Sequence, residues 1–103
     1  MSTADPAIVN KIKPKEDIPQ PGRYNVIYIN DEVTTMEFVV ETLVVIFNYT
    51  HMEADEVMIK IHENGSAVVA TLPYEMAEQK GVEVTQLART NGFPLVVKLE
   101  PEA

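Results

Sequence analysis

The chain has 103 residues, 46% of them hydrophobic, which is enough for one compact domain and too few for two. It contains no cysteine, which excludes disulfides, thiolate metal sites and a cysteine nucleophile. The formal net charge is −8, and after residue 22 five basic residues face thirteen acidic ones. A core this acidic disfavours nucleic-acid binding, which depends on Lys and Arg neutralising phosphates, and favours a cationic ligand group.

Residues 1–22 are predicted to form a disordered extension ahead of a core domain at residues 23–103. The segment has no aromatic residue and no apolar periodicity, so it buries too little surface to offset the entropy of ordering. Its four prolines are Pro6, Pro14, Pro19 and Pro21. Nowhere does the sequence contain an apolar run of about 18 residues or a signal-peptide pattern. We therefore expect a cytoplasmic protein with no membrane contact.

The first predicted strand, Tyr24–Asn30, leads into a polar triplet, Asn-Asp-Glu, at positions 30–32. Thr34 and Glu37 then have the spacing of a capping box, which predicts a helix N-terminus. The helix is predicted over Met36–Asn48 because its apolar residues recur at three- and four-residue spacing. A strand therefore passes into a helix through three hydrogen-bonding side chains, which can converge on one small polar group.

The later elements are predicted from caps, breakers and periodicity. They are a helix opened by Thr50-x-x-Glu53 and closed by Asn64-Gly65, a strand at Ser66–Leu72, a helix with Pro73 in its first turn that stops before Gly92, and a strand at Leu95–Leu99. The order β-α-α-β-α-β predicts an α+β fold, a two-layer sandwich with a small, antiparallel-rich three-stranded sheet and three helices.

The sequence lacks the motifs of the common enzyme classes. There is no glycine-rich phosphate loop, no His-x-x-x-His pair and no Gly-x-Ser-x-Gly elbow, so an enzyme is the minority interpretation. A metal site is also disfavoured, because the available ligands match no ligand spacing. Those ligands are Asp31, Glu32, His51, His62 and Glu63.

The polar triplet and His62 each have a purely structural interpretation. Asn and Asp fill turns because their side chains hydrogen-bond to nearby backbone. A histidine in the last turn before Gly65 interacts favourably, when charged, with the helix C-terminus. His62 also lies one turn after Met58, at the border of an apolar stripe, where an imidazole can share a pocket. The residues alone do not decide between these alternatives.

Three segments resemble the ClpS family, adaptors that deliver proteins with destabilising N-terminal residues to a Clp AAA+ protease. They are VIYINDEVTTMEFVVETL, MIKIHENGSAV and GFPLVVKLE, and the resemblance covers residues 23–101. The resemblance implies a protein with no catalytic activity of its own and no cofactor. The resemblance therefore implies an adaptor that binds bulky hydrophobic N-terminal residues, namely Leu, Phe, Tyr and Trp.

The resemblance also implies roles for individual residues. Asn30, Asp31 and His62 would hold the α-amino group of the target. The hydrophobic pocket and its rim would be formed by Thr34, Met36, Val39, Met58, Ile61 and Leu95, and the unfoldase N-terminal domain, of ClpA or ClpC type, would contact Glu75 and Lys80. Two positions depart from the family pattern: Glu32 stands where a second Asp is more common, and Thr35 where Pro is common.

A second hypothesis comes from another functional class. A small α+β sandwich resembling the C-terminal domain of the ribosomal stalk protein would bind a protein partner through its third helix. The two hypotheses differ in one requirement, because only the adaptor needs a free α-amine on its ligand.

Overall fold

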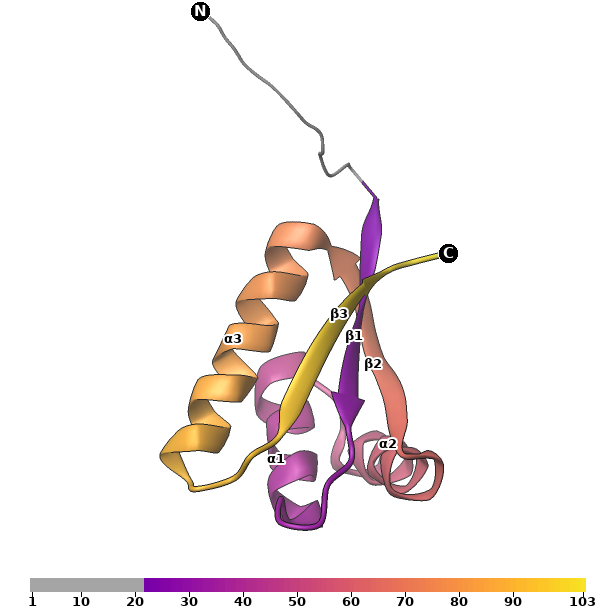
Figure 1. Cartoon of the computed structure of the whole chain (residues 1–103). Coiled ribbons are helices and arrows are strands. Elements are labelled where there is room, and N and C mark those ends of the chain that lie inside the picture. The colour runs from indigo at the N-terminus through magenta and orange to yellow at the C-terminus, as the bar shows by residue number, and fades with distance from the viewer. Residues whose placement is uncertain (1–21) are drawn as a thin grey trace, which may run out of the picture.

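The structure, a computed structural model, describes residues 22–103, so the predicted extension lies outside the described residues except for Gly22. The elements follow the predicted β-α-α-β-α-β order (Figure 1). They are β1 (Arg23–Ile29), α1 (Met36–Phe47), α2 (His51–Asn64), β2 (Ser66–Pro73), α3 (Tyr74–Thr90) and β3 (Val96–Pro101). Over this part of the chain no helix is both long and apolar enough to cross a membrane.

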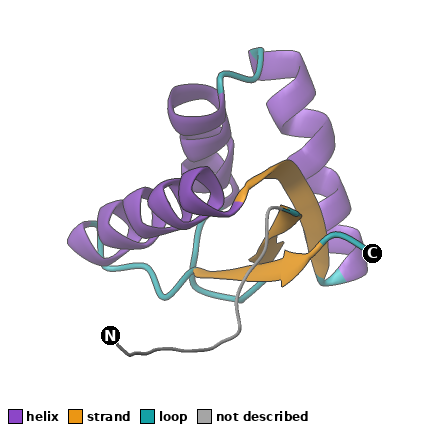
Figure 2. Cartoon of the chain, turned by 90° about the horizontal axis from the view of Figure 1, so that it is seen from above, coloured by secondary structure: helices purple, strands orange, loops and turns teal. Residues whose placement is uncertain are grey.

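The three strands form one antiparallel sheet in the order β2-β1-β3, with β1 at its centre. Ile29, the last residue of β1, pairs with Ser66 of β2 and with Val96 of β3. The helices gather on one face of this sheet, so the predicted α+β sandwich is confirmed (Figures 1 and 2). The C-terminal end of β1 therefore meets the segment that joins α2 to β2.

A buried hydrogen-bond chain ties the central strand to α1. Tyr28 and Thr42 are both fully buried, and the Tyr28 hydroxyl lies 2.7 Å from Thr42 Oγ1. The Thr42 hydroxyl donates to the Val39 carbonyl at 2.8 Å, so its oxygen is left to accept from Tyr28. Burial raises the pKa of the Tyr28 hydroxyl, and the hydrogen bond with Thr42 offsets part of that rise. Every polar atom of the pair is satisfied inside the core.

Helix α1 begins at Met36 as predicted, but its N-cap lies one residue after the predicted one. The N-cap is Thr35, whose side chain accepts from the Phe38 N–H at 3.1 Å. Thr34, the predicted capping residue, instead uses its hydroxyl and its N–H to donate to Asp31, at 2.7 and 2.6 Å. The prediction was wrong because the polar turn engages Thr34 before the helix begins.

The other helix ends are set by local chemistry. The predicted capping box of Thr50 and Glu53 is confirmed, with both of its hydrogen bonds present. Gly65 ends α2 in the left-handed conformation at φ 86°, which favours glycine. Pro73 is the N-cap of α3 rather than a residue of its first turn, because its backbone is extended at ψ 151°.

The buried stripe of α3 is narrow. It consists of Ala77, Val84 and Ala88, spaced at seven and four residues and fully buried. Met76 and Leu87 are exposed. Each precedes a stripe residue by one position, about 100° around a helix of 3.6 residues per turn.

Candidate functional site

The polar turn after β1, residues 30–34, is hydrogen-bonded to the end of α2. The Asn30 backbone N–H donates to the Gly65 carbonyl at 2.9 Å, extending the β1–β2 pairing past Ile29 and Ser66. The Asn30 side chain is exposed, and within residues 22–103 it has no hydrogen-bond partner. Its amide oxygen is therefore available as an acceptor beside the C-terminus of α2.

Asp31 organises the turn itself. Its Oδ1 accepts the N–H groups of Val33 and Thr34 at 2.8 and 2.6 Å, and its Oδ2 accepts the Thr34 hydroxyl at 2.7 Å. An ionised carboxylate offers about four acceptor positions, so roughly one remains for a ligand. The structural interpretation of this residue is therefore correct, and it leaves room for the binding role as well.

The carboxylate of Asp31 is held in its charged form. Partial burial raises the pKa of this carboxyl, but the hydrogen bonds from Thr34 and Val33 and the positive charge of Arg89 outweigh it. The net pKa lies below the usual value for aspartate. The turn therefore presents a negative charge at neutral pH.

His62 lies on α2, three residues before the Gly65 cap, and its side chain is exposed. The hydrogen bond from Asn30 to Gly65 thus brings the polar turn and the last turn of α2, which carries His62, to the same end of the molecule. The polar side chains of Asn30 and Asp31, and that of His62 from a separate segment, therefore lie toward the same end of the molecule. Two acceptors and an imidazole there suit a small cationic group.

The predicted hydrophobic set divides into two groups. Val39, Ile61 and Leu95 are 7%, 2% and 1% exposed and form part of the core. Thr34 and Met58 are half-buried, whereas Met36 at the start of α1 is 46% exposed. The three buried residues can form only the base of a hydrophobic pocket. The side chains of the two methionines are flexible, so they are the members that can move to admit an apolar side chain of a ligand.

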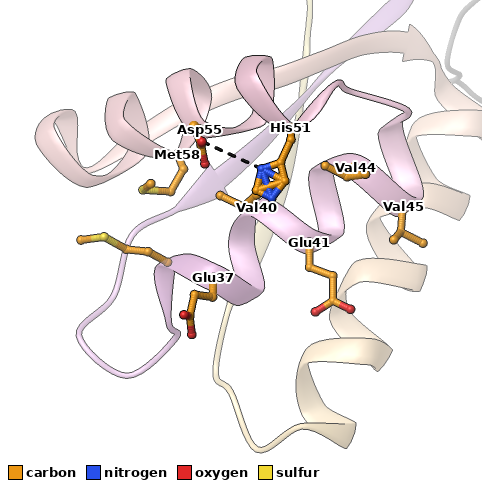
Figure 3. A pocket seen from close by; sticks show the side chains of 9 residues that line it. Glu37, Val40, Glu41, Val44, Val45, His51, Asp55 and Met58 are labelled. Carbon is orange, nitrogen blue, oxygen red and sulfur yellow. Dashed lines mark ion pairs between the residues drawn. The ribbon is translucent and has the colours of Figure 1, made fainter.

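A groove between α1 and α2 adjoins these methionines (Figure 3). It encloses about 460 Å³, and its lining is Met36, Glu37, Val40, Glu41, Val44, Val45, His51, Asp55 and Met58. The sequence prediction missed this groove. The only signal that could have suggested a polar edge to this groove is the position of Glu37 and Glu41, each next to the apolar stripe of the first helix.

Arg89 is another residue that the prediction missed. Its Nη1 donates to the carbonyls of Phe93 and Leu95, at 2.9 and 3.0 Å, which fixes the loop between α3 and β3. The Phe93 ring packs against Phe38 of α1 with centroids 5.0 Å apart. Through these contacts Arg89 positions Leu95, and its charge also acts on Asp31.

Glu75 and Lys80, the predicted unfoldase contacts, lie on different sides of α3. A separation of five residues corresponds to about 140° around a helix. Glu75 is exposed in the first turn, whereas the Lys80 ammonium donates to the Ile46 carbonyl of α1 at 2.9 Å. Lys80 therefore caps the C-terminal end of α1 as well as reaching the surface.

The potential metal ligands do not gather. Nowhere in residues 22–103 do three His, Asp or Glu side chains form a cluster that could hold a metal ion. His51 pairs instead with Asp55 at 3.9 Å across one turn of α2, and both side chains are exposed.

Comparison with known proteins identifies the family. Residues 19–98 match the family model described as ATP-dependent Clp protease adaptor protein ClpS. The ClpS adapter protein of Wolinella succinogenes is 44% identical over 90 residues, covering 87% of this chain and 88% of the relative. That of Acetivibrio thermocellus is 40% identical over 86 residues, covering 84% and 87%. This chain belongs to the ClpS family.

A solved ClpS structure has the same fold. Agrobacterium tumefaciens ClpS2 bound to L-phenylalaninamide superposes with a TM-score of 0.78 at 38% identity, over 81% of this chain and 100% of that chain. The chain is therefore an adaptor of an ATP-dependent Clp protease, and the described polar turn and groove belong to a ClpS fold.

Proposed function

We propose that this ClpS-family chain recognises substrate proteins by their first residue, binding the free α-amine and a bulky hydrophobic side chain, namely Leu, Phe, Tyr or Trp. Asn30, Asp31 and His62 accept hydrogen bonds from the ammonium N–H groups, and Met36 and Met58 close over the side chain. One observation carries the proposal: the Asn30–Gly65 hydrogen bond joins the polar turn to the helix end that bears His62. The phenylalaninamide bound by the Agrobacterium relative has both chemical features.

The energetics require both parts of the ligand. Each charge-assisted hydrogen bond contributes about 1.5–3 kcal/mol, and burial of a Leu or Phe side chain contributes about 1.5–3 kcal/mol. Association costs an estimated 4–15 kcal/mol, so neither part binds well alone. A blocked amine or a small first side chain should therefore abolish recognition.

The test is fluorescence anisotropy with peptides that begin with Phe, acetylated Phe and Ser. We expect binding only for free Phe, and Asn30→Ala should weaken it while keeping the backbone hydrogen bond to Gly65. Glu63→Ala is the matched surface control, because Glu63 is exposed on the same helix end. Equal binding of free and acetylated Phe would refute amine recognition and would favour the hypothesis of a general interaction domain.

Delivery is the second half of the proposal. The core at residues 23–103 binds the substrate in the cytoplasm and docks on the N-terminal domain of a ClpA- or ClpC-type unfoldase through a surface that includes Glu75 and Lys80. Residues 1–22 serve as the extension that the unfoldase engages. Exposed Glu75 supports this docking surface, together with the exposed Tyr74 and Met76 beside it. A pull-down with the isolated unfoldase domain, comparing wild type with Glu75→Lys, tests it directly.

A further inference from the structure

The loop between α3 and β3, residues 91–95, lies beside the polar turn. Figure 1 shows the two segments at the same end of the molecule. They line one hollow, which is formed by Val33, Arg89, Gly92, Phe93 and Pro94. The loop ends at Leu95, which is 1% exposed and was predicted to line the pocket for the first side chain of the substrate, here called the first-residue pocket. The conformation of this loop therefore sets where the base of that pocket lies.

The side chain of Arg89 holds the second half of this loop. Its Nη1 donates to the Phe93 carbonyl at 2.9 Å and to the Leu95 carbonyl at 3.0 Å. Within residues 22–103 no other side chain donates to either carbonyl. The backbone fixes the first half, because the Phe93 N–H donates to the Ala88 carbonyl at 2.8 Å, but Pro94 has no N–H to donate. Removal of Arg89 therefore takes away the side-chain anchor of the segment that carries Leu95.

The charge of Arg89 does not explain a role in binding a cation. Its positive charge acts on the carboxylate of Asp31, the group beside which the proposed ligand places its ammonium. Two positive charges near one carboxylate repel each other. An aspartate with the ordinary pKa of about 3.9 is already ionised at neutral pH without a neighbouring cation. Arg89 therefore contributes to recognition through the position of its loop, while its charge opposes the ligand.

We propose that Arg89 is a positioning residue that sets the depth of the first-residue pocket, and thereby the ranking of bulky first side chains, by holding Leu95 at the base. This inference rests on the proposed function. If the loop relaxes, the base recedes, so that a short ligand side chain such as Leu loses contact with it and a long one such as Trp gains room. Loss of contact with one methylene group corresponds to about fourfold in affinity. Removal of Arg89 should therefore shift selectivity from Leu towards Trp by about that factor.

The experiment measures the affinities of leucinamide, phenylalaninamide and tryptophanamide for the full chain by isothermal titration calorimetry. Arg89→Leu removes the donor and keeps an apolar side chain in its place, and it should lower the ratio of leucinamide to tryptophanamide affinity about fourfold. Arg23→Leu is the matched control. It removes an exposed arginine that donates to the Thr71 carbonyl at 2.6 Å, at the opposite end of β1 from the polar turn, and it should leave the ratio unchanged.

A ratio of affinities separates positioning from loss of folded protein, because unfolded molecules remove sites for all three amides equally. A wild-type ratio in Arg89→Leu overturns the proposal, and so does an equal change in Arg23→Leu.

Gly92→Ala tests the same loop with Arg89 in place, and it decides the question if Arg89→Leu does not fold. Gly92 has a φ of 79°, so an added Cβ strains the turn, although the Cβ meets no atom within 4 Å. The ratio should fall in this variant too, and a wild-type ratio would count against the proposal. If phenylalaninamide fails to bind wild type, the proposed function itself is wrong. If all three amides bind and the ratio never changes, only the positioning role fails.

Discussion

Asp31→Asn separates the two roles of the central turn residue. The substitution preserves shape and keeps an Oδ1 acceptor for the N–H groups of Val33 and Thr34. The new amide can donate to the Thr34 hydroxyl, which lies 2.7 Å from the present Oδ2. The turn should therefore survive, while the negative charge that we propose faces the ligand ammonium is lost. Asp31→Ala, by contrast, removes the turn and the charge together.

The size of the effect follows from the hydrogen bonds already made. Three of about four acceptor positions on Asp31 are used locally, so a ligand gains one charge-assisted bond at a partly exposed group. Such a bond contributes about 1–2 kcal/mol after allowance for solvent exposure. Asp31→Asn should therefore weaken binding of a Phe-initiated peptide roughly 5- to 30-fold. Its unfolding free energy should fall by less than about 1 kcal/mol, because the backbone acceptor remains.

The assay combines anisotropy with urea unfolding of the same preparations. Glu56→Gln is the control, since it removes one negative charge from an exposed position of α2 that does not line the groove. The reasoning fails if Asp31→Asn binds the peptide as tightly as wild type, because Asp31 would then act only as a turn former. It also fails if the control loses as much affinity, because overall charge would then explain the result.

Four other predictions concern the core, the proposed pocket, the N-terminal segment and the response to acid. Thr42→Val removes the acceptor of the buried Tyr28 hydroxyl and should lower the free energy of unfolding by about 1–3 kcal/mol. A double-mutant cycle with Tyr28→Phe measures the coupling between the two side chains, and additive losses of stability would contradict the shared hydrogen bond. Met36→Ala should admit peptides that begin with Ile or Val while still binding Phe, because in the proposed pocket we expect the side chain of Met36, at the start of α1, to crowd the β-carbon of the ligand; unchanged rejection of Ile places the clash elsewhere. Deletion of residues 1–20 should leave peptide affinity within about twofold but sharply reduce degradation of a Phe-initiated substrate by the reconstituted protease, and equal degradation rates would refute a delivery role. Because the pKa of Asp31 is lowered in the folded state, its contribution to stability is complete above the unfolded pKa near 3.9 and is lost as the pH falls through the folded pKa. The free energy of unfolding should therefore fall less steeply with decreasing pH in Asp31→Asn than in wild type. Identical pH dependences would contradict the pKa shift.

Sequence reasoning identified the elements because their signals are local. The capping box at Thr50 and the glycine at position 65 bound α2 through hydrogen bonds among residues a few positions apart. The run of β-branched and aromatic residues predicted β1, and the structure then places Val26 and Tyr28 on its buried face. Where two local signals competed, the sequence could not rank them. Thr34 fits a capping box, but its hydroxyl and its N–H donate hydrogen bonds to Asp31, so Thr35 caps the helix.

The sequence by itself determined the composition of the candidate site, its acidic character and the helices and strands that carry it, because these depend on residue type and short-range periodicity. Only the tertiary structure decided which residues meet. The Asn30–Gly65 hydrogen bond joins segments 35 residues apart, and Arg89 reaches the carbonyl of Leu95 while its charge acts on Asp31. The groove between Glu41 and Asp55 likewise exists only because α1 packs against α2. Such contacts depend on how the elements pack in space, and no pattern within a single element encodes that packing.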